Sequence, residues 1–411
     1  MYKVFLIHLT KIKLNRMHSK KKRVLYISPD GILEPLGDSQ VLKYLEELSQ
    51  DFIIELISFE KENDFRNLEK LNVIKARCVV NEILWSPKKY RQGILIYSQI
   101  VNICNFIFYP AWVMLKKKYN ILHIRSYMPG LSVLFLSYFF NFKLIFDIRG
   151  FWADEKHDRL GWKKKSLKYR FFKRLEKYLF NRADAIVTLT KGAKEYVNNE
   201  FHISNDQIFV IRTCVDFKEF TLPEKIIVKP GLKVGYLGTI DTAYDFDKFL
   251  YFISGLKNYN PALEICMLTK SPLKQIKKYL EKNNLLDVKL TNHFLGRHEL
   301  SQAINQFDLL AFCLKENFSI VASMPTKIGE SLACGVPIVC NAFNQDIKDM
   351  IQSEGIGEIY DFIEPLSHDA YNSLLLKIKS PSMAKLCRDF SKKEFSLESA
   401  VLIYKKIYEG L

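Results

Sequence analysis

The sequence lacks the features of a disulfide-bonded, zinc-binding or membrane-spanning protein. Its eight cysteines include no Cys-x-x-Cys pair and lie mostly in apolar runs, which is typical of reduced, buried thiols in a cytoplasmic protein. No apolar run reaches the ~20 residues that a membrane-spanning helix needs, and the nearest candidates, residues 100–115 and 131–140, are shorter. The first residues show no signal-peptide core. No Gly-x-Gly-x-x-Gly motif follows a strand pattern, which argues against a dinucleotide-dependent dehydrogenase.

Positive charge is abundant and unevenly distributed. Residues 1–225 hold 39 basic and 24 acidic side chains, whereas residues 226–411 hold 22 and 21, so the first half carries almost all of the net charge of +16. Basic clusters at 116–118, 163–165 and 168–174 alternate with aromatic and aliphatic residues, which suits the anionic cytoplasmic face of a membrane. A solvated basic surface is the alternative. We expect no nucleic-acid partner, because no zinc-finger, basic-zipper or RNA-recognition signature is present.

Strand and helix patterns alternate in two successive series. The 411 residues, 48% of them apolar and 26% charged, indicate a folded protein of about two or three domains. Short apolar runs predict strands at 24–28, 52–58, 121–124, 143–147 and 185–189, and the pattern restarts at 233–237 after a linker at 223–230 that contains two prolines. We predict an α/β protein with two Rossmann-like, doubly wound domains facing each other across a cleft.

The most informative segment is residues 323–339, which predicts a helix over 324–334 followed by a buried strand. Ser323 is a capping residue, Pro325 suits a first helical turn, and Gly335 suits a left-handed C-terminal cap. Lys327 and Glu330 lie three positions apart and share a helix face near the N-terminus, where free N–H groups favour an anion. A cation for phosphate and a carboxylate for sugar hydroxyls predict a nucleotide-sugar site. An exposed, solvated Lys–Glu pair is the alternative.

Two further segments carry small or acidic residues at the start of a predicted helix. Gly37, Asp38 and Ser39 lie between the first strand and the first helix, where a small-residue turn would let a diphosphate approach backbone amides; a simple helix cap is the alternative. Asp245 and Asp247 have the Asp-x-Asp form of metal-dependent transferases. They more readily complement a helix dipole, so we expect no required metal.

Polar residues also follow two strands of the first half. Asp147 and Arg149, with Asp154 and Glu155 a few residues later, come after the strand at 143–147, where they would orient or deprotonate an acceptor hydroxyl and bind its anionic part. Arg125 ends another strand and would contact an acceptor phosphate. A structural network of ion pairs is the alternative for all five residues.

Several of these segments together resemble the retaining glycosyltransferases of family 4, which have the GT-B fold. The resemblance rests on GYLG at 235–238, IRTCVD at 211–216 and SMPTKIGESLACGVP at 323–337; DGILEPLGDSQVL at 30–42 and FDIRGFWADE at 146–155 look like a bacterial branch of surface-polysaccharide synthesis. It spans roughly residues 22–410. It implies an N-terminal appendage (1–20), an acceptor-binding domain (21–222), a linker (223–230), a donor-binding domain (231–392) and a final helix crossing back to the first domain (393–411).

The sequence departs from the family pattern at three positions. Ala322 stands where many members have a donor-sugar glutamate, Thr239 where many have a basic residue after the domain-opening Gly238, and Phe146 where many have a histidine. The resemblance therefore implies that the diphosphate relies on Lys327 and the start of its helix, and that no histidine acts as a base. The implied donor-binding residues are Gly37, Asp38, Ser39, Gly238, Thr239, Ser323, Pro325, Thr326, Lys327 and Glu330.

Taken together, the residues and the resemblance predict a cytoplasmic retaining hexosyltransferase at the inner face of the membrane. It would need no cofactor beyond its nucleotide-sugar substrate and would act on a lipid-linked saccharide in surface-polysaccharide synthesis. Lys327 would stabilise the departing diphosphate, while Asp147 and Arg149 would act on the acceptor. Two alternatives stay open: a nucleotide-sugar 2-epimerase of the same fold, and an inert subunit that binds a sugar nucleotide or a lipid.

Overall fold

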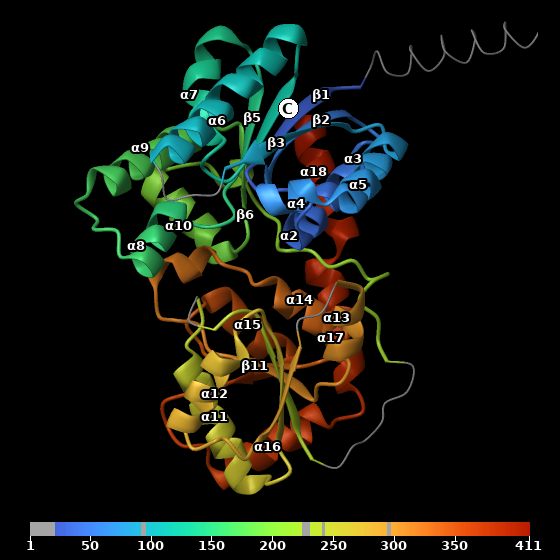
Figure 1. Ribbon diagram of the computed structural model, residues 1–411, viewed down its shortest axis with the longest axis vertical. Coiled ribbons are helices and arrows are strands. Elements are labelled where there is room, and N and C mark those ends of the chain that lie inside the picture. Colours follow the sequence, from blue (N-terminus) through green and yellow to red (C-terminus); the bar gives the residue numbers. More distant parts are fainter. Residues whose placement is uncertain (1–20, 92–95, 224–230, 241–242, 294–296) are drawn as a thin grey trace, which may run out of the picture.

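The computed structural model describes residues 21–91, 96–223, 231–240, 243–293 and 297–411, which form two α/β domains stacked along the long axis (Figure 1). The expected appendage at 1–20 and residues 224–230 of the expected linker lie outside the described residues. The two sheets follow one another in the chain, with seven strands before the linker and six after it. The predicted fold class, two doubly wound domains, is confirmed.

The first sheet is parallel throughout and has the strand order β3-β2-β1-β4-β5-β6-β7. Its central strands β1, β2, β4, β5 and β6 are almost completely buried, as strands covered by helices on both faces are, whereas the edge strands β3 and β7 are partly exposed. The parallel arrangement places the carboxyl ends of all seven strands at one edge, the usual place for a site in such sheets. The strands are β1 (Arg23–Ser28), β2 (Ile53–Lys61), β3 (Leu84–Tyr90), β4 (Ile121–Arg125), β5 (Lys143–Asp147), β6 (Ala185–Thr188) and β7 (Ile208–Val210).

Two helical layers cover the first sheet, each with its own apolar cluster. On one face lie α6 (Ile96–Lys116), α7 (Gly130–Phe139), α9 (Leu167–Arg182) and α10 (Lys191–Phe201), which share one cluster with the sheet. On the other face lie α3 (Lys43–Leu48), α5 (Leu68–Val80) and the last helix of the chain, α18 (Leu397–Gly410). Shorter elements are α2 (Pro35–Gly37), the π-helical turn η1 (Asp38–Leu42), α4 (Glu62–Arg66), α8 (Trp152–Leu160) and η2 (Asn205–Gln207).

The second sheet is also parallel, in the order β10-β9-β8-β11-β12-β13. Its strands are β8 (Lys233–Leu237), β9 (Glu264–Leu268), β10 (Lys289–His293), β11 (Leu309–Phe312), β12 (Ile338–Cys340) and β13 (Gly357–Ile359). Its helices are α11 (Phe246–Tyr259), α12 (Leu273–Lys282), α13 (Arg297–Ile304), η3 (Phe318–Ala322), α14 (Thr326–Ala333), α15 (Gln345–Glu354), α16 (His368–Ile378) and α17 (Met383–Phe395).

The last two helices connect the domains. α17 packs on α14 in the second domain, and α18 begins after the cap Ser396 and packs on α3 in the first domain, as Figure 1 shows. Tyr404 and Tyr408 of α18 are buried there, and the Tyr408 hydroxyl lies 2.7 Å from Nδ1 of the buried His123. The final helix therefore belongs to the core of the first domain.

Direct contacts join the domains near the carboxyl ends of β5 and β6. Phe151 stacks on Phe318 with ring centroids 5.5 Å apart, and the Thr190 hydroxyl donates to the Val321 carbonyl at 2.7 Å. The Ser319 amide donates to Oδ2 of Asp158 at 3.1 Å. η3, which leads into α14, thus lies against α8 and α10 of the first domain.

Candidate functional site

The start of α14 faces the first domain through η3 and carries no side-chain cap. Pro325 is the residue before the helix, with φ −63° and ψ 131°, and no side-chain hydrogen bond caps the helix. Ser323 ends η3 instead, where its hydroxyl donates to the Ser319 carbonyl at 3.3 Å. The expected cap by Ser323, the helix start at 324 and the place of Pro325 in the first turn are therefore wrong. The left-handed Gly335 is confirmed, at φ +78°.

Lys327 points from α14 into the interior beneath the end of β8. Its side chain is buried, and its ammonium group donates a hydrogen bond to the Leu237 carbonyl. The same nitrogen lies 3.5 Å from the ring centroid of Tyr244 and 5.0 Å from that of Phe312. A Cβ atom added to Gly238 would lie 3.6 Å from it. The structure therefore brings Lys327 to the end of β8, next to Gly238 and to Leu237, which lies 90 positions earlier in the chain.

Burial lowers the pKa of Lys327 to about 7, and the nearby charge of Glu330 opposes this shift. Within the described ranges, no carboxylate forms an ion pair with the ammonium group, which aromatic faces surround. A cation without a neutralising partner, next to the start of a helix, is suited to receive an anionic group. Glu330 lies one turn later on α14 and is half-buried.

Tyr244, a few residues after Gly238, covers the ammonium group of Lys327. Gly238 has φ +106°, which favours glycine, and Thr239 is exposed. Residues 243–245 then pair with the segment after β11: the Lys315 amide donates to the Ala243 carbonyl at 3.0 Å and the Asp245 amide to the Cys313 carbonyl at 2.8 Å. This pairing holds Tyr244 over the lysine. Sequence reasoning missed Tyr244, because no motif marks an aromatic residue whose partner is on a distant helix.

The three residues expected to approach a diphosphate in the first domain have structural roles. Gly37 ends α2 and Asp38 and Ser39 begin η1, so the expected open turn is wrong. A Cβ atom at Gly37 would lie 2.0 Å from the Gly31 carbonyl oxygen, which explains the glycine by close backbone packing. Asp38 accepts a hydrogen bond from Nη1 of Arg77 at 2.7 Å, and Ser39 is buried. Their expected role in donor binding therefore has no support in their contacts.

The expected acceptor residues at the ends of β4 and β5 form a buried network. Asp147 is fully buried and accepts hydrogen bonds from the Tyr404 hydroxyl at 3.1 Å and from Nη1 of Arg125 at 3.4 Å. Nε of Arg125 donates to Oδ2 of Asp30 at 3.0 Å. Arg149 has the left-handed φ of +55° and lies 3.7 Å from Oδ1 of Asp147. The role of Asp147 as a proton acceptor for substrate is corrected, because α18 seals its carboxylate; the ion-pair alternative fits.

Asp154 and Glu155 at the start of α8 differ in their surroundings. Asp154 is buried and accepts hydrogen bonds from the Tyr169 hydroxyl at 2.6 Å and from Nζ of Lys173 at 3.0 Å, which corrects its expected acceptor role to a structural one. Glu155 is half-buried, and its carboxylate lies directly over Gly150, where a Cβ atom would come within 2.3 Å of Oε1. Burial raises the pKa of Glu155. Because α8 packs on η3, Glu155 stays a prediction for acceptor contact.

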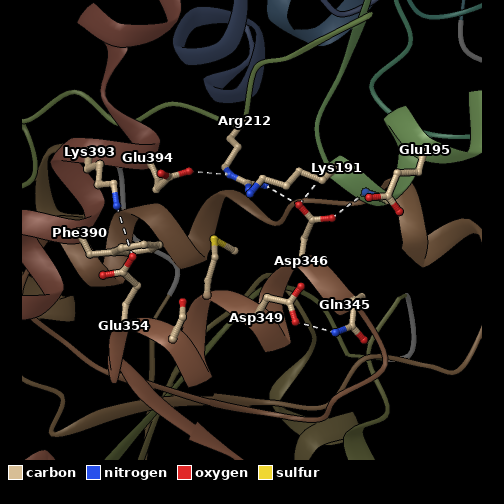
Figure 2. Close-up of a pocket in the computed structure, with 13 residues that line it drawn as sticks. Lys191, Glu195, Arg212, Gln345, Asp346, Asp349, Glu354, Phe390, Lys393 and Glu394 are labelled. Carbon is tan, nitrogen blue, oxygen red and sulfur yellow. Dashed lines mark hydrogen bonds and ion pairs between the residues drawn. The ribbon is translucent and has the colours of Figure 1, made fainter. Parts of the chain in front are cut away.

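A polar cavity of about 240 Å³ lies between the domains, lined by residues of α10, α15 and α17 (Figure 2). Its key contact is Asp346, whose carboxylate accepts hydrogen bonds from the Lys191 amide at 2.8 Å, the Gly192 amide at 2.9 Å and Nη1 of Arg212 at 3.0 Å. Nε of Arg212 donates to Glu394 at 3.3 Å. Sequence reasoning missed this contact, because its partners lie 134 to 155 residues from Asp346.

Asp245 caps α11 by accepting from the Lys248 amide at 3.0 Å, as the sequence predicts, and Asp247 lies within that helix. No group of three or more His, Cys, Asp or Glu residues in the described part of the chain is arranged to hold a metal ion.

Comparisons with known proteins agree with the fold. Residues 67–219 match the family described as Glycosyltransferase Family 4, so the resemblance is confirmed over most of the first domain. This match does not reach α14. No curated protein matches the sequence.

Solved structures are similar over nearly the whole chain at low identity. The Anabaena protein HepE in complex with UDP-glucose matches with a TM-score of 0.65 and 12% identity, covering 95% of this chain and 100% of that one. The lipopolysaccharide outer core galactosyltransferase WaaB matches at 0.60 and 15%, covering 95% and 100%. A putative UDP-N-acetylglucosamine 2-epimerase from Listeria monocytogenes matches at 0.57 and 11%, covering 95% and 98%. These likenesses identify the fold as GT-B.

Proposed function

We propose that this chain, which has the GT-B fold and matches glycosyltransferase family 4 over residues 67–219, transfers a hexose-type sugar from a nucleotide-diphosphate donor to a lipid-linked saccharide. The observation that carries the proposal is the position of Lys327, a buried cation at the start of α14 that forms no ion pair with a carboxylate of the described residues. A diphosphate is a ligand that this arrangement would neutralise. The HepE complex with UDP-glucose supports the same class of donor.

The proposed mechanism uses no protein nucleophile and retains the configuration at the anomeric carbon. The bond between the anomeric carbon and the diphosphate oxygen breaks, and the acceptor oxygen bonds to the same face of that carbon. The acceptor proton moves to the departing diphosphate. Lys327 and the amides at the start of α14 stabilise the negative charge that develops on that group, which is the main contribution such a site makes.

Glu330 would accept hydrogen bonds from the ribose, because it lies one turn after Lys327 on the same helix. The exposed Thr239 would lie next to the donor at the end of β8. On the acceptor side, Glu155 and Arg149 would face the sugar, since α8 lies against η3. Buried Asp147 would hold Arg149 in position and would take no proton from the acceptor.

Surface-polysaccharide synthesis at the inner face of the cytoplasmic membrane is the proposed setting. The likeness to a lipopolysaccharide galactosyltransferase and the basic excess of residues 1–225 support a lipid-linked acceptor. The likeness to a putative 2-epimerase keeps that activity as a second candidate, because the two activities share this fold.

One experiment separates the three functions. The full chain is titrated with UDP, GDP and other nucleotides, and is then incubated with the matching nucleotide sugars, with and without a lipid-linked saccharide. Transfer that needs the acceptor supports the proposal. Free epimerised sugar formed without an acceptor supports the epimerase, and nucleotide binding without turnover supports an inert subunit; either result contradicts the transferase.

A further inference from the structure

Two neighbouring helices of the first domain expose a continuous set of large apolar side chains. On α6 the outward side carries Tyr97, Ile100, Phe108, Trp112 and Leu115, of which Leu115 is 75% exposed. The adjacent α7 adds Phe135, Tyr138 and Phe139, and Tyr138 is 83% exposed. Neither helix contains a charged residue before Lys116 at the end of α6.

The opposite side of each helix is already used for packing. Phe106 and Val113 of α6 and Leu131 and Leu136 of α7 are buried in the cluster that covers the first sheet. Both helices are therefore apolar on two faces, whereas a surface helix of a soluble domain is normally polar on its outer face. Patches of this kind mark interaction sites.

Cations border this apolar surface. Nζ of Lys88 lies 3.4 Å from the Tyr109 ring, Nζ of Lys116 lies 3.4 Å from the Trp112 ring, and Lys118 is exposed at the end of α6. On the other side α9 packs on α7 and exposes Lys168, Arg170, Arg174 and the preceding lysines 163–165, together with Leu167 and Phe171.

Carboxylates are almost absent from the same three helices. The described parts of α6, α7 and α9 contain one, Glu176, and it is buried and bonded to Tyr127 and Lys173. The outer surface of α6, α7 and α9, here called the α6–α7–α9 face, therefore combines exposed aromatic rings with an excess of positive charge, although carboxylates of other elements pair with Lys117, Lys173 and Arg182.

We infer that the α6–α7–α9 face docks onto an anionic lipid bilayer, with the rings of α6 and α7 in the interfacial layer and the lysines and arginines among the headgroups. The inference rests on the proposed function, since docking would bring a lipid-linked acceptor to the enzyme. α8 packs on α9 on one side and on η3 on the other, so the docked surface is close to the approach to α14.

Two other occupants fit less well. α6 is long and apolar enough to cross a membrane by length and composition, but its inner side packs on the sheet, so crossing would expose the domain core. A symmetric contact with a second copy would bring the same cationic border against itself, and the one carboxylate in the described parts of these helices, Glu176, is buried and could not pair with it. Neither objection applies to anionic lipid.

The test measures sedimentation of the full chain with vesicles of phosphatidylcholine, alone or with anionic phosphatidylglycerol. A ring variant carries Phe108→Ser, Trp112→Ser and Tyr138→Ser, and a charge variant carries Lys163→Glu, Lys164→Glu and Lys165→Glu. Matched controls lie elsewhere: Lys274→Glu, Lys277→Glu and Lys278→Glu on α12 for charge, and Val80→Ser and Leu376→Ser for exposed apolar residues.

We expect wild type to bind anionic vesicles selectively, and each face variant to lose at least about tenfold in affinity while the controls bind like wild type. Equal binding by face variants and controls would overturn the inference, as would a wild type that ignores anionic vesicles. A wild-type dimer that the ring variant converts to a monomer would assign the face to a second copy instead.

Nucleotide binding and transfer to a detergent-solubilised acceptor are measured on the same preparations. If these persist in a variant that has left the vesicles, the docking face and the reaction are separate properties. If vesicle binding is intact but no transfer occurs, the proposed function is wrong and the docking face is not affected.

Discussion

The helices α10 and α14 both begin near the junction between the domains, and the groups around their N-termini differ. At α10 the amides of Lys191 and Gly192 donate to the Asp346 carboxylate of the other domain, and the Ala193 amide donates to the Thr190 hydroxyl at 3.0 Å. At α14 no side chain of the described residues caps the helix, and a buried lysine lies in its first turn. The second domain thus supplies an anion to the start of α10, whereas the start of α14 is the place that we propose for the donor diphosphate.

The contacts of Asp346 indicate that the carboxylate at the start of α10 has a structural role. Asp346 is buried and also pairs with Arg212, which in turn pairs with Glu394, so the carboxylate at the start of α10 is hydrogen-bonded and links the two domains. Lys327 has a carbonyl and aromatic faces around it, and burial lowers the pKa of its ammonium group.

The largest effect is expected for Asp346→Ala, which removes the carboxylate that accepts hydrogen bonds from the start of α10. This change removes three hydrogen bonds and leaves the buried Arg212 without its closest carboxylate, at a cost of about 3–5 kcal/mol. Urea unfolding should show the loss in free energy of unfolding, and small-angle scattering should show a wider separation of the domains. Asp349→Ala on the same helix, an exposed position, is the control. Equal stability of the two variants would contradict a structural role for the α10 contact.

The donor site proposed at the start of α14 is tested by Lys327→Ala. Loss of one group that stabilises the departing charge should lower kcat by about two to three orders of magnitude. Turnover is measured at saturating donor, with Lys277→Ala, an exposed lysine of the same domain, as the control. A kcat close to that of wild type would remove Lys327 from the site.

The pH dependence of nucleotide affinity provides a further test of Lys327. Because the pKa of ligand-free Lys327 is about 7, a diphosphate must recruit a proton above that pH, and its affinity should fall by up to about tenfold per pH unit. Calorimetry in buffers of different ionisation enthalpy should detect proton uptake near pH 8. The variant Lys327→Arg keeps its charge, so its affinity should vary little; a wild-type slope in this variant would refute the assignment.

The lowered pKa of Lys327 also affects the free energy of unfolding. The pKa of Lys327 is lowered on folding, so between about pH 7 and 10 the unfolded chain binds more protons than the folded one. This group therefore makes the free energy of unfolding rise with pH across that window, and its contribution is constant below it. Lys327→Met should remove this part of the slope in urea unfolding measured from pH 7 to 10.

The smallest effect is expected for Glu330→Gln. It keeps the size of the side chain but weakens its hydrogen bonds to a ribose, so nucleotide affinity should fall by about tenfold, the scale of one charge-assisted bond. Equilibrium titration with the nucleotide measures this. Since Glu330 also supports the charge on Lys327, the variant should shift the pH dependence of binding to lower pH. Unchanged affinity and unchanged pH dependence would place Glu330 outside the site.

The fold could be predicted from the sequence because its signals are local. Apolar runs predicted the central strands of both sheets, and Gly335 marked the end of α14 at the expected residue. The strands β3, β7, β10 and β13, which lie at the edges of the sheets, were not predicted. The start of α14 was harder to predict. Ser323 is the residue directly after η3, and Pro325 takes the N-cap position of α14.

The site could be predicted only in part, because burial is decided by distant residues. Asp147 looks like a free carboxylate at a strand end until Tyr404, 257 positions later, covers it. Asp346 looks like an ordinary first-turn acid until it meets α10, 154 positions earlier. Lys327 was found from its spacing to Glu330. Its aromatic surroundings could not be predicted, because they depend on the pairing of residues 243–245 with residues 313–315, which no sequence motif indicates.

The placement of α18 has a consequence for how the molecule is made. This helix completes the core of the first domain, yet it is synthesised after the whole second domain. Until then His123 and Asp147 lack their tyrosine partners. The first domain therefore cannot complete its core until the second domain has been synthesised.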